Sequence, residues 1–393
     1  MPARSPDPSL PAPAPGALAH SSRLVGRIRR EIEAAGGSIG FDRYMELALY
    51  TPGLGYYMAG AAKFGPAGDF VTAPESAPLF ARVLARQVGE ILERCGGGWV
   101  LEPGAGTGAL AAGLIQALEG EGAPWSRYVI LEPSGELRAR QEARLAREVP
   151  HLLGRVRWID RLPERFRGVL VANEVLDALP VRCFVKRDDA IRERCVGLAG
   201  GERLDWVERP ADAALRAAAA ACERVAGGWS PGYASEWCQR LPAWIASFAE
   251  RLERGALLLI DYGYPRAEYY HPQRIRGTLL CHYRHRAHED PFFLPGLQDI
   301  SANVDFTAVA EAGQGAGLEV AGYTTQAQFL LALGIAEAVA EAGDALEQAR
   351  RAQEIQRLVL PSEMGDRFHV MLLTRGVAGP FRGFALRDFR GRL

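Results

Sequence analysis

The segment 101–108 holds the residues whose chemistry is easiest to interpret. Glu102 precedes Gly104, Gly106 and Gly108, and this run lies where an apolar strand is expected to end and a helix to begin. Glycines permit a tight turn and let the backbone approach a nucleotide ligand closely, while the helix N-terminus presents free N–H groups. The segment therefore predicts a nucleotide-binding turn. The alternative is a glycine-rich turn without a ligand.

The same turn fits two classes of ligand. Gly104, Gly106 and Ala109 also satisfy the dinucleotide fingerprint, so the turn alone does not separate NAD from S-adenosylmethionine. The preceding acid favours S-adenosylmethionine, because the Glu102 carboxylate can meet the ammonium of the methionine moiety, directly or through water. A pyrophosphate would be repelled by the same carboxylate.

Two further acids follow predicted strands. Glu132 ends a strand at 128–132, where its carboxylate can accept hydrogen bonds from both ribose hydroxyls of an adenosine. Asp160 follows the next strand and can meet an adenine amino group. The alternatives are a surface carboxylate near a helix start for Glu132 and an ordinary turn residue for Asp160.

Asn173, Glu174 and Asp177 follow a fourth predicted strand, at 169–172. Two acids three residues apart would share one face of a helix, and ligands bind beyond the carboxyl ends of strands in open α/β sheets. Placed around an arginine side chain, the two carboxylates can bind the guanidinium and hold its positive charge away from one nitrogen, which becomes more nucleophilic. The alternative is a capped helix start.

Short apolar strands alternate with helices in the part of the chain that carries these residues, which predicts a parallel sheet of right-handed βαβ units. Seven core strands are expected, at 99–102, 128–132, 156–159, 169–172, 256–261, 318–324 and 368–373. The helices between and after them are expected at 109–118, 136–147, 306–312 and, for the most part, 327–358.

This core is predicted to occupy 98–393, after a disordered Pro/Ala-rich tail at 1–20 and an N-terminal segment at 21–97. That segment is expected to hold helices at 24–35 and 41–50 and a glycine-rich loop at 53–78.

Two insertions are expected in the core, at about 186–250 and 264–300. In the first, strands at 192–198 and 203–207 form a hairpin around Gly200 and Gly201, and helices follow at 211–225 and 243–254. The second is predicted to be a polar loop.

Composition limits the class of protein. The chain has 393 residues, 48% of them apolar and 24% charged, as in folded globular proteins of one or two domains. A net charge of -1 gives no overall field for nucleic acid, and no stretch approaches the roughly 18 apolar residues of a transmembrane helix. The six cysteines lack CxxC spacing, so we expect no disulfide framework or zinc site and a cytoplasmic location, ahead of a mitochondrial presequence.

Histidines in the second insertion invite a metal interpretation. His282, His285 and His288, with His271 upstream, lie among arginines without a cysteine or a paired acidic ligand. Zinc sites combine such ligands at characteristic spacings. We therefore expect a solvated polar loop and no metal.

Five motifs follow one another along the chain, at 68–75, 102–108, 173–180, 260–264 and 276–279. This series resembles the MidA family of S-adenosylmethionine-dependent methyltransferases. Its members include a mitochondrial complex I assembly factor that is a protein arginine methyltransferase. The resemblance covers about 41–373, nearly the whole folded chain.

The resemblance implies an α/β fold with a Rossmann-like, seven-stranded class I methyltransferase core, S-adenosylmethionine as cofactor, and an N-terminal segment closing over it. Glu174 and Asp177 become the candidate catalytic residues. Asn303 stands where relatives commonly have His, which puts any acid–base role of that His in doubt here. The candidate cofactor contacts are Asp69, Thr72, Glu102, Gly104, Gly106, Gly108, Glu132, Asp160 and Asn173.

The expected function is methyl transfer to an arginine of a protein substrate, without nucleic-acid partners or membrane insertion; a homo-oligomer remains open. The alternative from another class is a catalytically silent, cofactor-binding chaperone that assembles a respiratory or other protein complex. The intact glycines and both acids argue against it. An NAD-dependent oxidoreductase is disfavoured by the acid before the glycines and by the lack of a recognisable hydride-transfer constellation.

Overall fold

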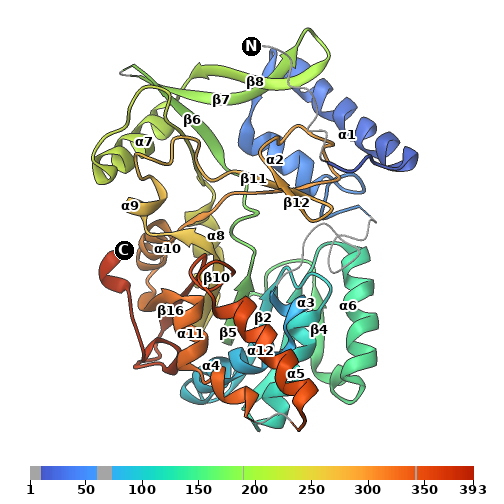
Figure 1. The fold of residues 1–393 in the computed structure, drawn as a ribbon, viewed down its shortest axis with the longest axis vertical. Coiled ribbons are helices and arrows are strands. Elements are labelled where there is room, and N and C mark those ends of the chain that lie inside the picture. The colour runs from blue at the N-terminus through green and yellow to red at the C-terminus, as the bar shows by residue number, and fades with distance from the viewer. Residues whose placement is uncertain (1–9, 60–72, 189, 341–342) are drawn as a thin grey trace. The chain divides into compact units, whose positions relative to one another are not determined.

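The computed structural model describes residues 10–59, 73–188, 190–340 and 343–393. The chain divides into two compact units, each of which is built from three stretches of sequence (Figure 1). The first unit comprises Met1–Val71, Ala178–Arg240 and Arg266–Asn303, and the core unit comprises Thr72–Asp177, Leu241–Pro265 and Val304–Leu393.

The core unit is built on an eight-stranded sheet, of which seven strands form one continuous path in the order β15-β16-β10-β5-β2-β3-β4. Strands β4, β3, β2, β5 and β10 run parallel, whereas β16 is antiparallel to both β10 and β15. This is the expected Rossmann-like fold with all seven predicted strands. The bounds are β2 Gly98–Pro103, β3 Trp125–Leu131, β4 Val156–Ile159, β5 Phe166–Asn173, β10 Leu252–Tyr264, β14 Val304–Asp305 (beside β10), β15 Glu319–Thr325 and β16 Phe368–Arg375.

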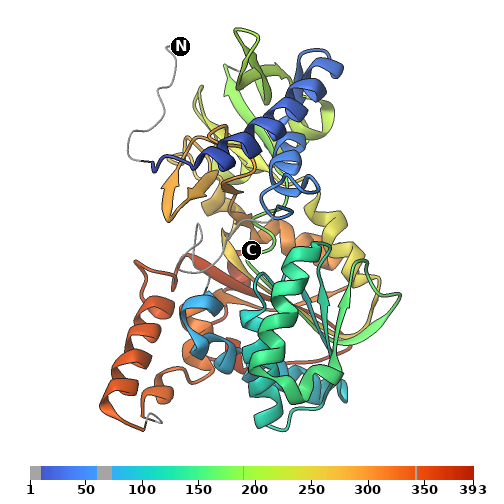
Figure 2. The same ribbon diagram turned by 90° about the vertical axis from the view of Figure 1, so that its right-hand side faces the viewer.

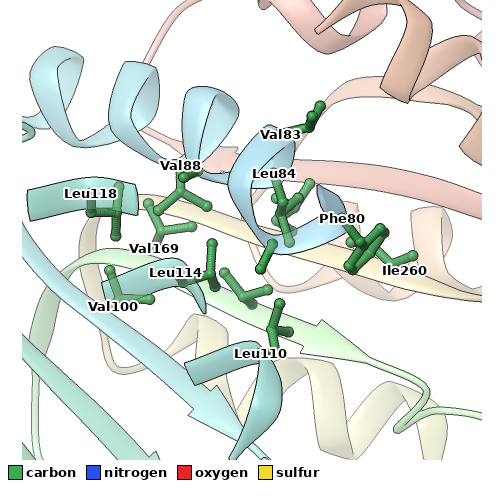
Figure 3. Packing of buried hydrophobic residues seen from close by; sticks show 14 of the residues in the cluster. Phe80, Val83, Leu84, Val88, Val100, Leu110, Leu114, Leu118, Val169 and Ile260 are labelled. Atoms are coloured by element: carbon green, nitrogen blue, oxygen red, sulfur yellow. The ribbon is translucent and has the colours of Figure 1, made fainter. Parts of the chain in front are cut away.

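One face of this sheet is covered by α4 and α5. Apolar side chains of both helices meet those of β2, β5 and β10, as the close view of Phe80, Leu114 and Val169 shows (Figure 3). Helix α12 contacts α4 on the same side (Figure 2). The helices of this layer and its edge are α3 Ala73–Ser76, α4 Pro78–Cys95, α5 Ala109–Gly120, α6 Gly135–Glu148, α11 Gln326–Ala332 and α12 Ala345–Val359.

The other face is covered by α8 (Leu241–Ala249) and α10 (Phe306–Gly315), which contact each other. Side chains of β16 alternate between the faces, as the period of a strand requires. Leu372 belongs to the cluster under α4, whereas a Cβ on Gly313 of α10 would lie 2.8 Å from Leu373. The sheet is therefore buried on both sides, as parallel sheets are.

The first unit contains two antiparallel sheets. The larger has the order β1-β7-β6-β9, with β8 paired to β7 in the predicted hairpin around Gly200 and Gly201. Its strands are β1 Ser38–Gly40, β6 Arg182–Arg187, β7 Ala190–Ala199, β8 Arg203–Pro210 and β9 Ala234–Trp237, and the helices of the unit are α1 Pro15–Ala34, α2 Phe41–Tyr50, α7 Ala213–Ala226 and α9 Arg266–Tyr269. Apolar residues of α1, α2, β6 and β7 form a separate core.

The predicted loop at 264–300 was wrong. This stretch forms α9 and a small sheet of β11 (Leu280–Tyr283), β12 (Arg286–His288) and β13 (Asp299–Ser301). The β11–β12 turn consists of Arg284 and His285, both at positive φ. Two-residue turns of this type are usually signalled by Asn or Gly, so the sequence contained no turn signal.

Three predicted boundaries also need correction. Helix α1 begins at Pro15, inside the predicted tail, because Pro is well suited to a first helical turn. The helix predicted at 243–254 ends at Ala249, and its last residues belong to β10. The boundary at 97/98 falls inside the core unit, because the buried face of α4 packs on the core sheet. Across the described residues, no helix is long and apolar enough to cross a membrane.

Candidate functional site

The carboxyl ends of five adjacent parallel strands form one edge of the core sheet. Glu102, Glu132 and Asn173 lie at the ends of β2, β3 and β5, and Asp261 lies near the end of β10. The chain crosses to one side from β2 to β3 and to the other from β5 to β10, so the boundary between β2 and β5 is a topological switch point. Ligands bind at such points in open α/β sheets.

The glycine turn after β2 has the backbone that its sequence predicts. Gly104, Gly106 and Gly108 have φ values of 66°, 53° and 84°, a region that residues with a Cβ adopt at a cost. Gly108 is also the N-cap of α5, and a Cβ there would lie 3.3 Å from Gln141 Cα. The turn leads directly into the helix N-terminus, whose N–H groups are available to an anionic group.

Glu102 is a buried carboxylate beside this turn. Its Oε2 accepts a hydrogen bond of 2.6 Å from the Tyr128 hydroxyl, and among the described residues no cation forms an ion pair with it. Burial raises the pKa of Glu102 to about 7, and the neighbouring Glu132 adds to the rise. A buried acid of this kind is stabilised in its charged form by a positive group.

Glu132 is held by two donors at the end of β3. Its Oε1 accepts from the Ser134 N–H at 2.8 Å and its Oε2 from Gln141 Nε2 at 3.0 Å. Because Glu132 is only 6% exposed, the alternative of a surface carboxylate is wrong. Each carboxylate oxygen can still accept a further hydrogen bond.

Gln141 is a site residue that the sequence analysis missed. Its Nε2 also donates to the Gly106 carbonyl at 3.0 Å, and its Oε1 accepts from Trp158 Nε1 at 3.0 Å. This fully buried amide on α6 therefore connects the glycine turn, Glu132 and β4. The sequence feature that could have pointed to Gln141 is its place as an amide on the apolar face of an amphipathic helix.

Glu75, the last residue of the motif at 68–75, contacts the glycine turn. It accepts hydrogen bonds from the Thr107 hydroxyl and from the Arg144 guanidinium, the latter at 2.9 and 3.2 Å. Arg144 also donates to the Thr107 hydroxyl. The other two candidates of this motif, Asp69 and Thr72, lie outside the described residues.

The acidic turn, residues 173–177, follows β5 without forming a helix. The expected shared helical face of Glu174 and Asp177 was therefore wrong, and so was the alternative of a capped helix start. Glu174 has a φ of 53° and donates its N–H to the Ile260 carbonyl at 2.9 Å, which continues the β5–β10 ladder. The acidic turn also lies against the glycine turn, since a Cβ on Gly104 would be 3.5 Å from Val175 Cγ2.

Asp261 accepts the backbone donors of the acidic turn. Its Oδ2 accepts from the N–H groups of Val175, Leu176 and Asp177 at 3.1, 2.8 and 3.3 Å, and its Oδ1 from the Tyr262 N–H at 2.8 Å. Burial raises the pKa of Asp261 to about 7, while these hydrogen bonds oppose the rise. Asp261 belongs to the motif at 260–264, but nothing in the local sequence assigned it a role.

Asn173, the first residue of the acidic turn, has a buried side-chain oxygen without a hydrogen-bond donor among the described residues. Its Nδ2 donates to Glu174 Oε1 at 2.9 Å, whereas its Oδ1 is buried without a hydrogen-bond partner among the described residues. A buried acceptor without a donor costs on the order of 1–3 kcal/mol. A ligand with an N–H or O–H group would satisfy it.

The strained backbone of Glu174 leads to a stability prediction. Glu174→Gly is expected to be more stable than Glu174→Ala by about 0.5–1 kcal/mol, because only glycine adopts this φ without a Cβ clash, less its entropic cost. Thermal unfolding of both variants measures the difference.

The matched control is Glu142, an exposed acid inside helix α6. There Gly should be less stable than Ala by about 1 kcal/mol. The same sign at both positions would contradict the assignment of strain to Glu174.

The two remaining candidates have other partners among the described residues. Asp160 follows β4 as an exposed side chain near Arg161. Asn303 is in the first unit, where its N–H donates to the Thr278 hydroxyl at 3.0 Å. The neighbouring motif at 276–279 is held by the buried Glu236, which accepts from the N–H groups of Thr278 and Leu279.

Three histidines of the second insertion, His282, His285 and His288, lie on β11, in the β11–β12 turn and on β12, whereas His271 follows α9. Burial lowers the pKa of His282, and the nearby His288 acts in the same direction. Within the described parts of the chain, no group of three or more His, Cys, Asp or Glu side chains is arranged to hold a metal ion.

Comparison with protein families matches most of the chain. A family model described as "Putative S-adenosyl-L-methionine-dependent methyltransferase" matches residues 83–324. The chain is 28% identical to a mouse protein named "Protein arginine methyltransferase NDUFAF7, mitochondrial", over 86% of this chain and 81% of that protein. The human protein of the same name is 26% identical, over 86% and 80%.

Solved structures agree. A crystal structure from Burkholderia thailandensis bound to S-adenosyl-homocysteine has a TM-score of 0.94 and 48% identity, and covers 98% of this chain and 100% of that one. A native structure from the same organism gives a TM-score of 0.91 at the same identity and coverage.

Proposed function

We propose that this chain, which belongs to the MidA family of S-adenosylmethionine-dependent methyltransferases, methylates the side chain of an arginine in a protein substrate. The observation that supports the arginine assignment is the acidic turn, where Glu174 and Asp177 follow β5 against the glycine turn. Relatives at 26–28% identity that are named protein arginine methyltransferases add support.

The residues at the sheet edge fit S-adenosylmethionine. The glycine turn allows close approach of the backbone, and buried Glu102 and the unpartnered Asn173 Oδ1 suit a cationic N–H group such as the methionine ammonium. Glu132 can accept from ribose hydroxyls while it keeps its two protein donors. When bound, the cofactor supplies an electrophilic methyl group on its sulfonium.

The chain's own residues would orient the acceptor. Two carboxylates can bind a guanidinium and hold its positive charge away from the nitrogen that attacks. Because arginine is protonated at neutral pH, a proton leaves during or after the attack, and a strong base is not needed beforehand. Orientation and exclusion of water supply most of the rate enhancement in this proposal.

Two measurements test the proposed function. Calorimetry should detect binding of S-adenosylmethionine and S-adenosyl-homocysteine but not of NAD, since Glu102 repels a pyrophosphate. Labelled methyl from the cofactor should then appear on arginines of proteins in a lysate from cells that lack this enzyme, with sites identified by mass spectrometry.

Other outcomes lead to other conclusions. Label only on lysine, on carboxyl groups or on small molecules would refute the arginine assignment. Cofactor binding without transfer to a lysate that contains its natural partners would favour the alternative of an assembly chaperone.

We also propose a cytoplasmic location. All six cysteines are free thiols in the structure, and five of them are buried, which suits a reducing compartment. Because the mouse and human relatives are named mitochondrial, fractionation of the source cell with antibody detection is the direct test.

A further inference from the structure

We propose that Asp261 is a positioning residue that sets the conformation of the acidic turn, and thereby the placement of Glu174 and Asp177 for methyl transfer. The proposal rests on the proposed function for its kinetic part. It does not make Asp261 a catalytic residue, because its carboxylate is occupied by backbone donors of the protein itself.

Asp261 is bonded to backbone donors of the acidic turn and of its own strand. Four backbone N–H groups converge on one carboxylate that is 1% exposed. Three of them belong to consecutive residues that no helix satisfies, so Asp261 takes over the part that an N-cap plays at a helix start. Within the described residues no Lys, Arg or His forms an ion pair with Asp261, so backbone donors are its stabilising partners.

The backbone of the acidic turn is strained at Glu174. Glu174 has a left-handed backbone, which a non-glycine residue keeps only when its surroundings impose it. On one side its N–H is bonded to Ile260 of β10, and directly after it the chain is bonded to Asp261 of the same strand. Strand β10 therefore determines the path of the acidic turn through two consecutive residues.

The position of Asp261 in the sheet supports the same role. Asp261 lies on β10 one residue beyond the pair that Ile260 forms with Asn173, the last residue of β5. Glu174 and Asp177 therefore lie in the turn that directly follows the buried strand β5, and their side chains are half-buried rather than extended into solvent. Catalytic groups on such supports are held more precisely than groups on free loops.

The test compares Asp261→Asn with Glu90→Gln in the full-length protein. An amide at 261 presents an NH₂ group to at least one backbone N–H, so one or more of the four hydrogen bonds is lost without a change in shape. Glu90 is a control in the same unit: it is a buried carboxylate on α4 whose Oε2 accepts from the Arg382 N–H at 3.0 Å and whose Oε1 pairs with Arg94 at 2.7 Å, and neither of these partners belongs to the acidic turn.

Three quantities are measured on each protein. These are the affinity for S-adenosyl-homocysteine by calorimetry, the turnover number for methyl transfer, and amide hydrogen exchange of a peptide covering 173–180. Asp261→Asn should keep the affinity within a few-fold, lower turnover on the order of 10–100-fold, and speed exchange at Val175, Leu176 and Asp177. Glu90→Gln should change neither turnover nor that exchange.

Several results would overturn the proposal. The first two are unchanged exchange and turnover in a folded Asp261→Asn variant, and equal losses in both variants. The third is a lack of protection of the amides at Val175–Asp177 in the wild-type protein, which can be measured even if no variant folds. Absence of arginine methylation by the wild type would instead refute the proposed function, and the exchange data would still decide whether Asp261 holds the turn.

Discussion

Glu174→Gln and Asp177→Asn are each expected to lower methyl transfer by roughly 100-fold or more while affinity for S-adenosylmethionine stays within a few-fold. Both substitutions keep the shape of the side chain and remove its charge. If the two carboxylates hold a guanidinium, the neutral amides lose the charge-assisted hydrogen bonds that orient the acceptor.

The measurement is single-turnover transfer of labelled methyl to the protein substrate, with cofactor affinity from calorimetry. Glu142→Gln is the matched control, since Glu142 is an exposed acid on α6 paired with Arg138, and its activity should equal that of the wild type. Equal activity in all three variants and the wild type would mean that the acids of the turn have no role with the acceptor. A large loss of cofactor affinity would reassign them to the cofactor.

Glu132→Ala should weaken cofactor binding by about 2–4 kcal/mol, because two charge-assisted hydrogen bonds to the ribose are lost. The structure adds a second reason. Gln141 loses one of its hydrogen-bond partners, and the same amide supports the Gly106 carbonyl. A folded Glu132→Ala variant should therefore bind S-adenosyl-homocysteine more weakly by roughly 30- to 900-fold.

Glu136→Ala is the control for this second prediction. Glu136 lies on the first turn of α6, which begins three residues after Glu132, and pairs with Arg140 at the surface. Its replacement should leave affinity unchanged. Unaltered affinity in a folded Glu132→Ala variant would show that Glu132 only supports Gln141 and the turn.

The sequence by itself determined the core sheet and the glycine turn. Both depend on local rules: apolar strands of four to eight residues separated by amphipathic helices, and glycines where a strand passes into a helix. Strands β2, β4 and β5 and helices α2 and α5 accordingly appeared close to their predicted bounds. The motifs at the strand ends followed, because parallel strands bring their carboxyl ends to one edge.

Only the tertiary structure decided which groups support the site. Gln141 and Asp261 act through bonds between residues 35 and 84–86 positions apart, and local patterns contain no information on such partners. The acidic turn follows the same rule: its spacing predicted a helical face, but residues 174–177 form a turn in which the N–H groups of residues 175–177 donate to the buried carboxylate of Asp261 on β10.

The division into units also depended on long-range contacts. The first unit collects three distant stretches around its own apolar core, and α4, which precedes the predicted core in sequence, packs on the core sheet. Burial of apolar faces selects the partners of each element, and this selection acts between surfaces in space rather than between neighbours in sequence.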